Sequence, residues 1–128
     1  MNADLSRIEI NGVSYVRADS MKDDSVKSVA GLQYSIVRSY AAGVFAGYIN
    51  KTEYHDGIKE CEVLEARRIF YWDGAASLSQ LSQDGTSKPK NCKFTMIVPS
   101  VVLSNVIEVL PLTAKAKKSI DSVAVWSE

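Results

Sequence analysis

Short segments rich in β-branched and aromatic residues, separated by turn-forming residues, dominate this chain, and such segments favour strands. Beyond the N-terminal region we expect strands at residues 33–38, 44–49, 58–72, 94–98 and 105–110. A short helix is expected between the third and fourth of these, and another helix follows the last. This order is typical of an antiparallel sheet with helices packed on one side.

The dipeptide Asn11-Gly12 separates two alternating segments, Arg7–Ile10 and Val13–Arg17. Both central residues of a type I′ turn need positive φ, which asparagine and glycine tolerate best. The sequence therefore predicts an N-terminal hairpin over residues 7–17. Residues 19–31 are polar, mixed in charge and without a clear period, so we expect a mobile loop there.

Two glycines, Gly43 and Gly47, bracket Phe45 in the strand expected at 44–49. A glycine inside a strand marks a β-bulge or the close approach of another backbone or a ligand. The sequence alone leaves these possibilities open.

Two helices are indicated by their end signals. Asp73 is a candidate N-cap and Gly85 a left-handed stop for the first, whose apolar residues Ala75, Leu78 and Leu81 are three apart. Thr113 can cap the second, whose apolar stripe is Ala116, Ile120 and Val123. We expect Val125-Trp126 to dock on the domain after this helix.

With 128 residues, the chain has the size of one domain, which buries roughly two-thirds of its unfolded surface. We expect an α+β fold over residues 1–128. Its features are an antiparallel sheet of about six to seven strands, a short central helix and a C-terminal helix packed on one side, with the core at 33–126. Its 46% hydrophobic and 23% charged residues are ordinary for a globular protein.

Charge and cysteine content exclude several classes of function. Fifteen basic residues balance 15 acidic ones, so no global field draws the chain to long nucleic acid or an anionic membrane. Cys61 and Cys92 fit neither a disulfide framework nor a metal-ligand spacing. We expect no second ligand group near His55, and therefore no metal site. No apolar run approaches 18 residues, which predicts a soluble, intracellular protein.

The sequence shows no catalytic apparatus. A Ser/His or Cys/His arrangement would depend wholly on His55, the one histidine. Glu60, Glu62 and Glu65 are typical of the solvent face of a strand. The glycines near Phe45 lack the lysine and the further glycine of a phosphate-binding loop. We therefore expect neither an enzyme nor a cofactor.

Binding chemistry is concentrated between Arg67 and Phe94. In an extended segment Arg67 and Arg68 point to opposite faces, each beside aromatic residues that include Phe70 and Trp72. A guanidinium beside an aromatic ring suits base stacking and bidentate phosphate contact. An arginine packed over a core tryptophan is the structural alternative.

A turn and a basic loop follow these aromatics. The turn at Asp73–Ala76, with Ser77 beyond it, presents a helix N-terminus that attracts phosphate, although the Asp73 carboxylate can fill that place itself. Lys88, Lys90 and Lys93 surround Asn91, whose amide can read a base edge. A merely solvated loop is the alternative.

Several strings in the chain resemble a family of small phage-encoded proteins. They are Tyr34–Arg38, Gly43–Gly47, Ala66–Trp72 with Gly74–Leu78, Asn91–Phe94, Val106–Leu110 and Thr113–Ile120. The similarity covers about residues 33–126. The family includes the first-described Thoeris anti-defence proteins, which act as sponges for a signalling nucleotide.

The resemblance implies a non-catalytic protein in the host cell cytoplasm that sequesters a cyclic ADP-ribose isomer and thereby blocks Thoeris immunity. Some related sponges also capture cyclic oligonucleotides. The resemblance also implies a homo-oligomer. Local chemistry suggests the ligand-binding residues Arg38, Arg67, Arg68, Phe70, Trp72, Ser77, Lys88 and Asn91. The alternatives are a single-stranded nucleic-acid module and a structural or protein-inhibiting phage accessory protein.

Overall fold

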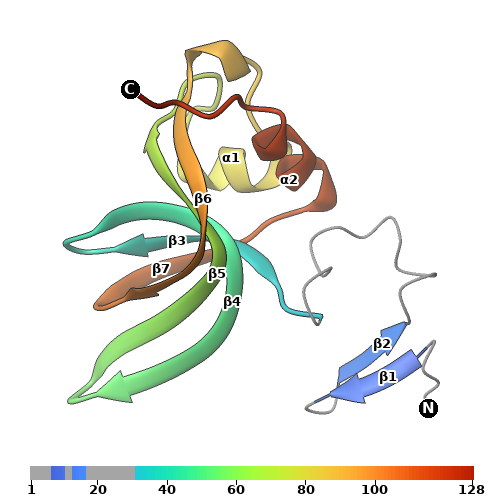
Figure 1. Cartoon of the computed structure of the whole chain (residues 1–128), viewed down its shortest axis with the longest axis vertical. Helices are drawn as coiled ribbons and strands as arrows, with labels where there is room; N and C mark the ends of the chain where they lie inside the picture. The colour runs from blue at the N-terminus through green and yellow to red at the C-terminus, as the bar shows by residue number, and fades with distance from the viewer. Residues whose placement is uncertain (1–6, 11–12, 17–30) are drawn as a thin grey trace.

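The computed structural model describes residues 7–10, 13–16 and 31–128 (Figure 1). Strands β1 (Arg7–Ile10) and β2 (Val13–Val16) pair antiparallel with Ile10 opposite Val13, which confirms the two strands of the N-terminal hairpin. Its Asn11-Gly12 turn, and the loop expected to be mobile except for Gly31, lie outside the described residues.

Five antiparallel strands form the main sheet, in the order β6-β5-β4-β3-β7. They are β3 (Tyr34–Ser39), β4 (Gly43–His55), β5 (Ile58–Tyr71), β6 (Lys93–Leu103) and β7 (Val106–Pro111). The α+β class is therefore confirmed. The expectation of six to seven strands in one sheet is wrong, because β1 and β2 pair with each other as a separate two-stranded sheet.

The β4–β5 hairpin is longer than the sequence pattern indicated. We expected the strand at 44–49 to end at Ile49, but pairing continues to His55 opposite Ile58. The connection is the dipeptide Asp56-Gly57, whose φ angles of 54° and 80° are those of a left-handed two-residue turn. Likewise β6 runs unbroken through Pro99, which an edge strand tolerates because the missing N–H is not needed by a neighbour.

Gly47 sits where two backbones come close. The pairing of β4 with β5 shifts register between Ala46 and Tyr48. A Cβ added at Gly47 would lie 2.5 Å from Val63 Cγ1 and 2.7 Å from the Leu64 carbonyl oxygen. Both expectations for this glycine, a bulge and a close backbone approach, are therefore met at the same position.

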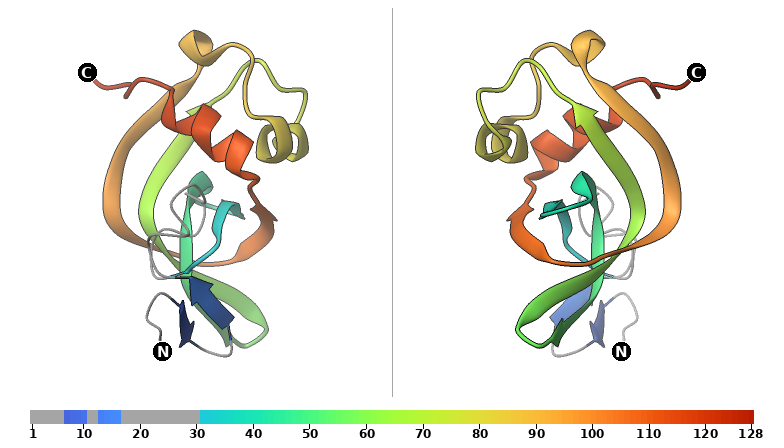
Figure 2. Two further views of the ribbon diagram at one scale, coloured as in Figure 1. Left: turned by 90° about the vertical axis from the view of Figure 1, so that its right-hand side faces the viewer. Right: turned by 90° about the vertical axis from the view of Figure 1, so that its left-hand side faces the viewer.

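The two edges of the main sheet meet at one corner. β6 and β7 lie at opposite edges, yet only Ser104 and Asn105 separate them in sequence. Tyr40 N donates to the Asn105 carbonyl at 3.0 Å, and Ser39 Oγ donates to the Ser104 carbonyl at 2.7 Å. The sheet is therefore strongly coiled, as an incomplete barrel (Figure 2). On one face of this sheet, side chains from its own five strands form a buried cluster: Val37, Phe45, Cys61, Val63, Ala66, Leu103 and Val106.

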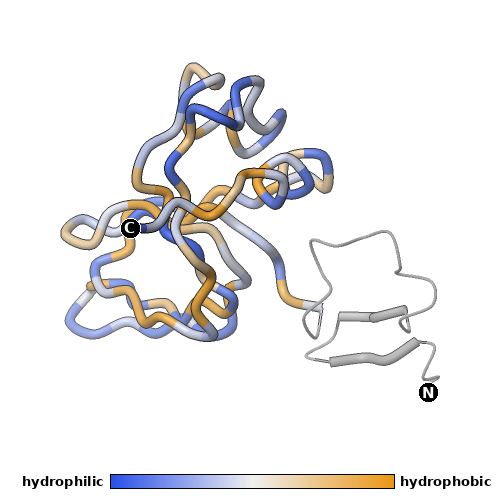
Figure 3. The backbone as a smooth tube through the Cα atoms, turned by 45° about the horizontal axis from the view of Figure 1, so that its top comes forward, coloured by the Kyte–Doolittle hydropathy of each residue, from blue (hydrophilic) through white to orange (hydrophobic). Residues whose placement is uncertain are grey.

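A second core lies where helices α1 (Leu78–Asp84) and α2 (Ala114–Asp121) pack on the sheet. Thr113 caps α2 and Gly85 ends α1, as expected. The N-cap of α1 is Ser77, whose hydroxyl accepts from Gln80 N at 3.2 Å, so the assignment of Asp73 as N-cap is wrong. A 3-10 turn, η2 (Pro89–Asn91), follows. Hydrophilic and hydrophobic stretches alternate along the described backbone (Figure 3).

The longest helix among the described residues, α2, has eight residues. No helix in this part of the chain has the length and apolar character needed to cross a membrane.

Candidate functional site

Arg67 is a buried arginine whose guanidinium bonds, in the described part of the chain, only to main-chain carbonyls. It is 3% exposed. Its Nε donates to Thr95 O at 2.8 Å, Nη1 to Ile120 O at 2.9 Å, and Nη2 to Val123 O at 2.6 Å and Phe94 O at 3.5 Å. Burial lowers the pKa of Arg67. This placement leaves no guanidinium surface for a ligand, so the predicted contact of Arg67 with a pyrophosphate does not fit the structure.

Arg68 lies on the opposite face of β5, as the alternation predicted. Its guanidinium carbon is 4.3 Å from the centroid of the Phe45 ring, and Nη1 donates to the Ala42 carbonyl at 2.7 Å. The residue is exposed. Of the two adjacent arginines, only Arg68 is therefore accessible to an anion.

An exposed aromatic pair stands at the end of β5. The Phe70 and Trp126 rings are stacked, with centroids 5.1 Å apart and planes 13° apart. Phe70 is 60% exposed and Trp126 38%. The Lys93 ammonium lies 5.4 Å from the centroid of the Trp126 ring. We call Phe70, Lys93 and Trp126 the C-terminal aromatic site.

The main chain sets the position of Trp126. Its N–H donates to the Phe94 carbonyl at 2.9 Å, and Val125 forms a parallel bridge with Phe94. The expected docking of Val125-Trp126 is thus confirmed. Trp126 was missing from the predicted site, since no local pattern shows that a tryptophan after the last helix meets the end of β5.

A groove of about 490 Å³ opens beside Trp126. Its lining includes the side chains of Lys90 and Ser122 together with Pro89, Cys92, Ala124, Val125 and Trp126. Its volume is in the range of small-molecule sites. Among the described residues, no carboxylate lies within ion-pair distance of Lys88, Lys90 or Lys93. The predicted basic loop therefore supplies ammonium groups at this end of the molecule.

Asp73 organises the turn that was expected to bind phosphate. Its Oδ1 accepts from Gly74 N at 2.8 Å, and its Oδ2 accepts from the Asn91 side-chain amide at 2.9 Å. The Asn91 and Gly74 hydrogen bonds lower the pKa of Asp73. The carboxylate thus occupies the anion position of this turn, and the Asn91 amide is already engaged with it.

The remaining predicted residues are dispersed. Trp72 is half-buried against the second core, and Ser77 is engaged as the α1 N-cap. Arg38 forms an ion pair of 2.9 Å with Glu108 on the neighbouring strand β7. Of the predicted set, the structure places Phe70 in the C-terminal aromatic site and Lys88 in the loop beside it.

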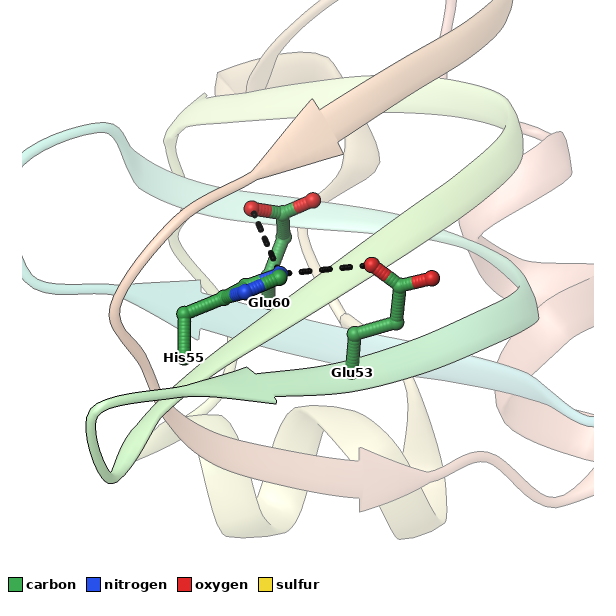
Figure 4. Close-up of side chains that lie close together, drawn as sticks. All are labelled: Glu53, His55 and Glu60. Atoms are coloured by element: carbon green, nitrogen blue, oxygen red, sulfur yellow. Dashed lines mark hydrogen bonds and ion pairs between the residues drawn. The ribbon is translucent and has the colours of Figure 1, made fainter.

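A second group of polar side chains lies at the tip of the β4–β5 hairpin. His55 Nε2 is 3.3 Å from Glu53 Oε1 and 4.0 Å from Glu60 Oε1 (Figure 4). The expectation that His55 has no second ligand group nearby is therefore wrong. It failed because pairing of β4 with β5 extends to this point, which brings Glu60 opposite Glu53. The contact with Lys51, and to a smaller extent the hydrogen bond from His55, lower the pKa of Glu53.

Comparison with known proteins gives one finding. No curated protein and no solved structure matches the chain. A family model matches residues 32–120, which hold the whole main sheet and nearly all of α2. The chain therefore belongs to the family described as a domain of unknown function, DUF6948.

Proposed function

We propose that this protein binds a small phosphorylated nucleotide at the C-terminal aromatic site and releases it unchanged. The observation that carries the proposal is the exposed, stacked pair Phe70 and Trp126, with the Lys93 ammonium above the indole. Stacking a base on an aromatic side chain contributes about 1–3 kcal/mol and is available to any base. Lysine ammonium groups are point-charge partners for phosphate.

The geometry suggests how the ligand is divided between these groups. The base stacks on the open side of Phe70, the more exposed of the two rings. The phosphates lie towards Lys93 and Lys90, the second of which lines the groove beside Trp126. Arg68 is the accessible guanidinium on the same strand as Phe70.

The proposed role is sequestration of a signalling nucleotide. The ligand class is a cyclic ADP-ribose isomer, with cyclic oligonucleotides as a further possibility, and the outcome is blocked Thoeris immunity in the cytoplasm of a phage-infected host. The family resemblance supports this role and the assembly of the chain into homo-oligomers. The exposed aromatic pair and the ammonium group beside it support a binder.

Calorimetry with cyclic ADP-ribose isomers tests the proposal, followed by heat release and chromatography of the bound ligand. We expect binding at micromolar concentration and recovery of unaltered ligand. Phe70→Ala and Trp126→Ala should each weaken binding by about tenfold or more, the equivalent of one lost stacking contact. Tyr40→Ala, which removes another exposed aromatic, is the matched control. Absence of binding, altered ligand, or an equal effect of the control would contradict the proposal.

A single-stranded nucleic-acid module is the second candidate, because the same rings and lysines suit an oligonucleotide. It predicts strongly salt-dependent binding to oligonucleotides, which release counterions as phosphates are neutralised. A sponge for one small ligand should show little such dependence.

The exposed Met96 and Ile97 on edge strand β6 favour the third candidate, a phage accessory protein that binds another protein.

A further inference from the structure

We propose that the tip of the β4–β5 hairpin is a binding site for a first-row divalent transition metal ion, with Glu53, His55 and Glu60 as its ligands. The three residues can each offer one ligand atom, and these atoms all lie within 4.8 Å of one another. None of them belongs to the C-terminal aromatic site, so this inference stands or falls separately from the proposed nucleotide binding.

The hairpin geometry brings the three side chains together. Glu53 and Glu60 are directly opposite each other in the β4–β5 pairing, and His55 is two residues after Glu53. Residues two apart in a strand share a face of the ribbon. The two-residue turn Asp56-Gly57 fixes the register, so the convergence seen in Figure 4 is built into the strand pairing and does not depend on a long loop.

The two carboxylates of this arrangement repel each other, and the Lys51 ammonium offsets part of that repulsion at Glu53. Two like charges directly opposite in an antiparallel pair are destabilising. Here His55 Nε2 faces oxygens of both carboxylates, at 3.3 Å from Glu53 and 4.0 Å from Glu60. A metal ion among these atoms would neutralise both carboxylates and use the imidazole nitrogen as its third ligand.

The donor set selects the class of metal. One imidazole nitrogen with two carboxylate oxygens suits zinc and its first-row neighbours, whereas calcium takes oxygen ligands alone. Three protein ligands leave further positions for water. A cavity of about 220 Å³ adjoins the carboxylates and provides that room; it is lined by Lys51, Glu53, Glu60, Glu62 and Val102.

Within the residues that the structure describes, Lys51 is the one cation in direct contact with this group. Its ammonium lies 2.9 Å from Glu53 Oε2, whereas His55 faces the other oxygen, Oε1. The lysine thus orients the carboxylate and leaves one oxygen for the metal. Its side chain is 65% exposed and can turn away into solvent.

The experiment is a Zn²⁺ titration of the full chain followed by NMR of the imidazole group. His55 is the one histidine in the sequence, so its ring signals report on this site without assignment ambiguity. We expect these signals to shift and to saturate at one equivalent. NMR identifies the binding site, which calorimetry alone does not, because Zn²⁺ can also bind the thiolates of Cys61 and Cys92.

Glu53→Gln and Glu60→Gln keep the side-chain size. Each should weaken Zn²⁺ binding at least tenfold, because replacing even a residue that hydrogen-bonds to a metal ligand weakens metal affinity by about 10–100-fold. Glu62→Gln is the matched control, because that carboxylate lines the same cavity but bonds to Asn50 and Ser100. It should leave the affinity unchanged. Lys51→Met should leave it unchanged or strengthen it.

Three results would overturn the proposal. The first is that the imidazole signals stay in place at millimolar Zn²⁺, and the second is that Glu62→Gln weakens binding as much as Glu53→Gln. An equal response of the imidazole signals to Ca²⁺ would rule out the transition-metal assignment. Circular dichroism of each variant confirms that it is folded before its affinity is compared.

Discussion

The Arg67 guanidinium donates a hydrogen bond of 2.6 Å to the carbonyl of Val123, 56 residues later in the chain. The same group also bonds to the Ile120 carbonyl at the end of α2. One side chain of β5 therefore fixes the end of α2 and the segment that carries Trp126. Arg67 acts as a structural residue, and the position of the aromatic site depends on it.

Arg67→Met should destabilise the fold strongly. The variant leaves buried carbonyls without donors, and each unsatisfied group costs about 1–3 kcal/mol. We expect a loss of roughly 3 kcal/mol or more, measured as the free energy of unfolding in urea. Arg68→Met, at an exposed neighbour with one main-chain contact, is the control and should lose much less. Equal losses would show that burial of Arg67 does not matter.

Gly47→Ala should be costly because of backbone contact. The new methyl group would lie 2.7 Å from the Leu64 carbonyl oxygen, which cannot move aside as a flexible side chain could. Overpacking of this kind costs about 1–3 kcal/mol. Thermal and urea unfolding measure it. Gly57→Ala is the comparison, since nothing lies within 4 Å of an added Cβ there and only its positive φ is strained. A Gly47→Ala protein as stable as wild type would refute the close approach.

Ser77→Ala should lose about 1 kcal/mol of stability, the usual value of a helix N-cap. The hydroxyl of Ser77 accepts from Gln80 N, so its removal leaves an N–H at the start of α1 without its partner. Ser79→Ala, an exposed serine inside α1, is the control for the loss of a hydroxyl. If the two variants unfold at the same urea concentration, Ser77 is not the cap.

Asp73 should make stability depend on pH in the acid range. Its pKa is lowered in the folded protein, so the ionised carboxylate stabilises the fold above the ordinary pKa of about 3.9. That contribution is lost as pH falls through the lower folded-state pKa. Asp73→Asn should therefore reduce stability at pH 7 and show a weaker dependence below pH of about 4. Urea unfolding of both proteins at several pH values measures this, and parallel curves would contradict it.

Much of the sheet, the start of α2 and the end of α1 could be predicted because their signals are local. Thr113 and Gly85 act where their chemistry indicated, and the β1–β2 pairing follows from Asn11-Gly12. The outer half of β4 was missed because it carries polar residues on both faces and therefore shows no hydrophobic alternation.

The candidate site was harder to predict for a different reason. Arg67 and Arg68 are adjacent and chemically identical. Whether each side chain is buried or exposed depends on segments that are distant in the sequence. α2 and the residues after it cover Arg67, whereas Arg68 packs over Phe45 and stays exposed. Trp126 reaches Phe70 across 56 residues of sequence. No local pattern carries such information.

The corner at Ser104 and Asn105 has a consequence for the order of assembly. β3 leaves the ribosome before β7, so one of its edges stays unpaired until β7 follows, about seventy residues later. Until then that edge offers unpaired amides and carbonyls to any neighbouring chain. During synthesis the chain is therefore prone to aggregate through β3 until β7 has been translated and has paired with it.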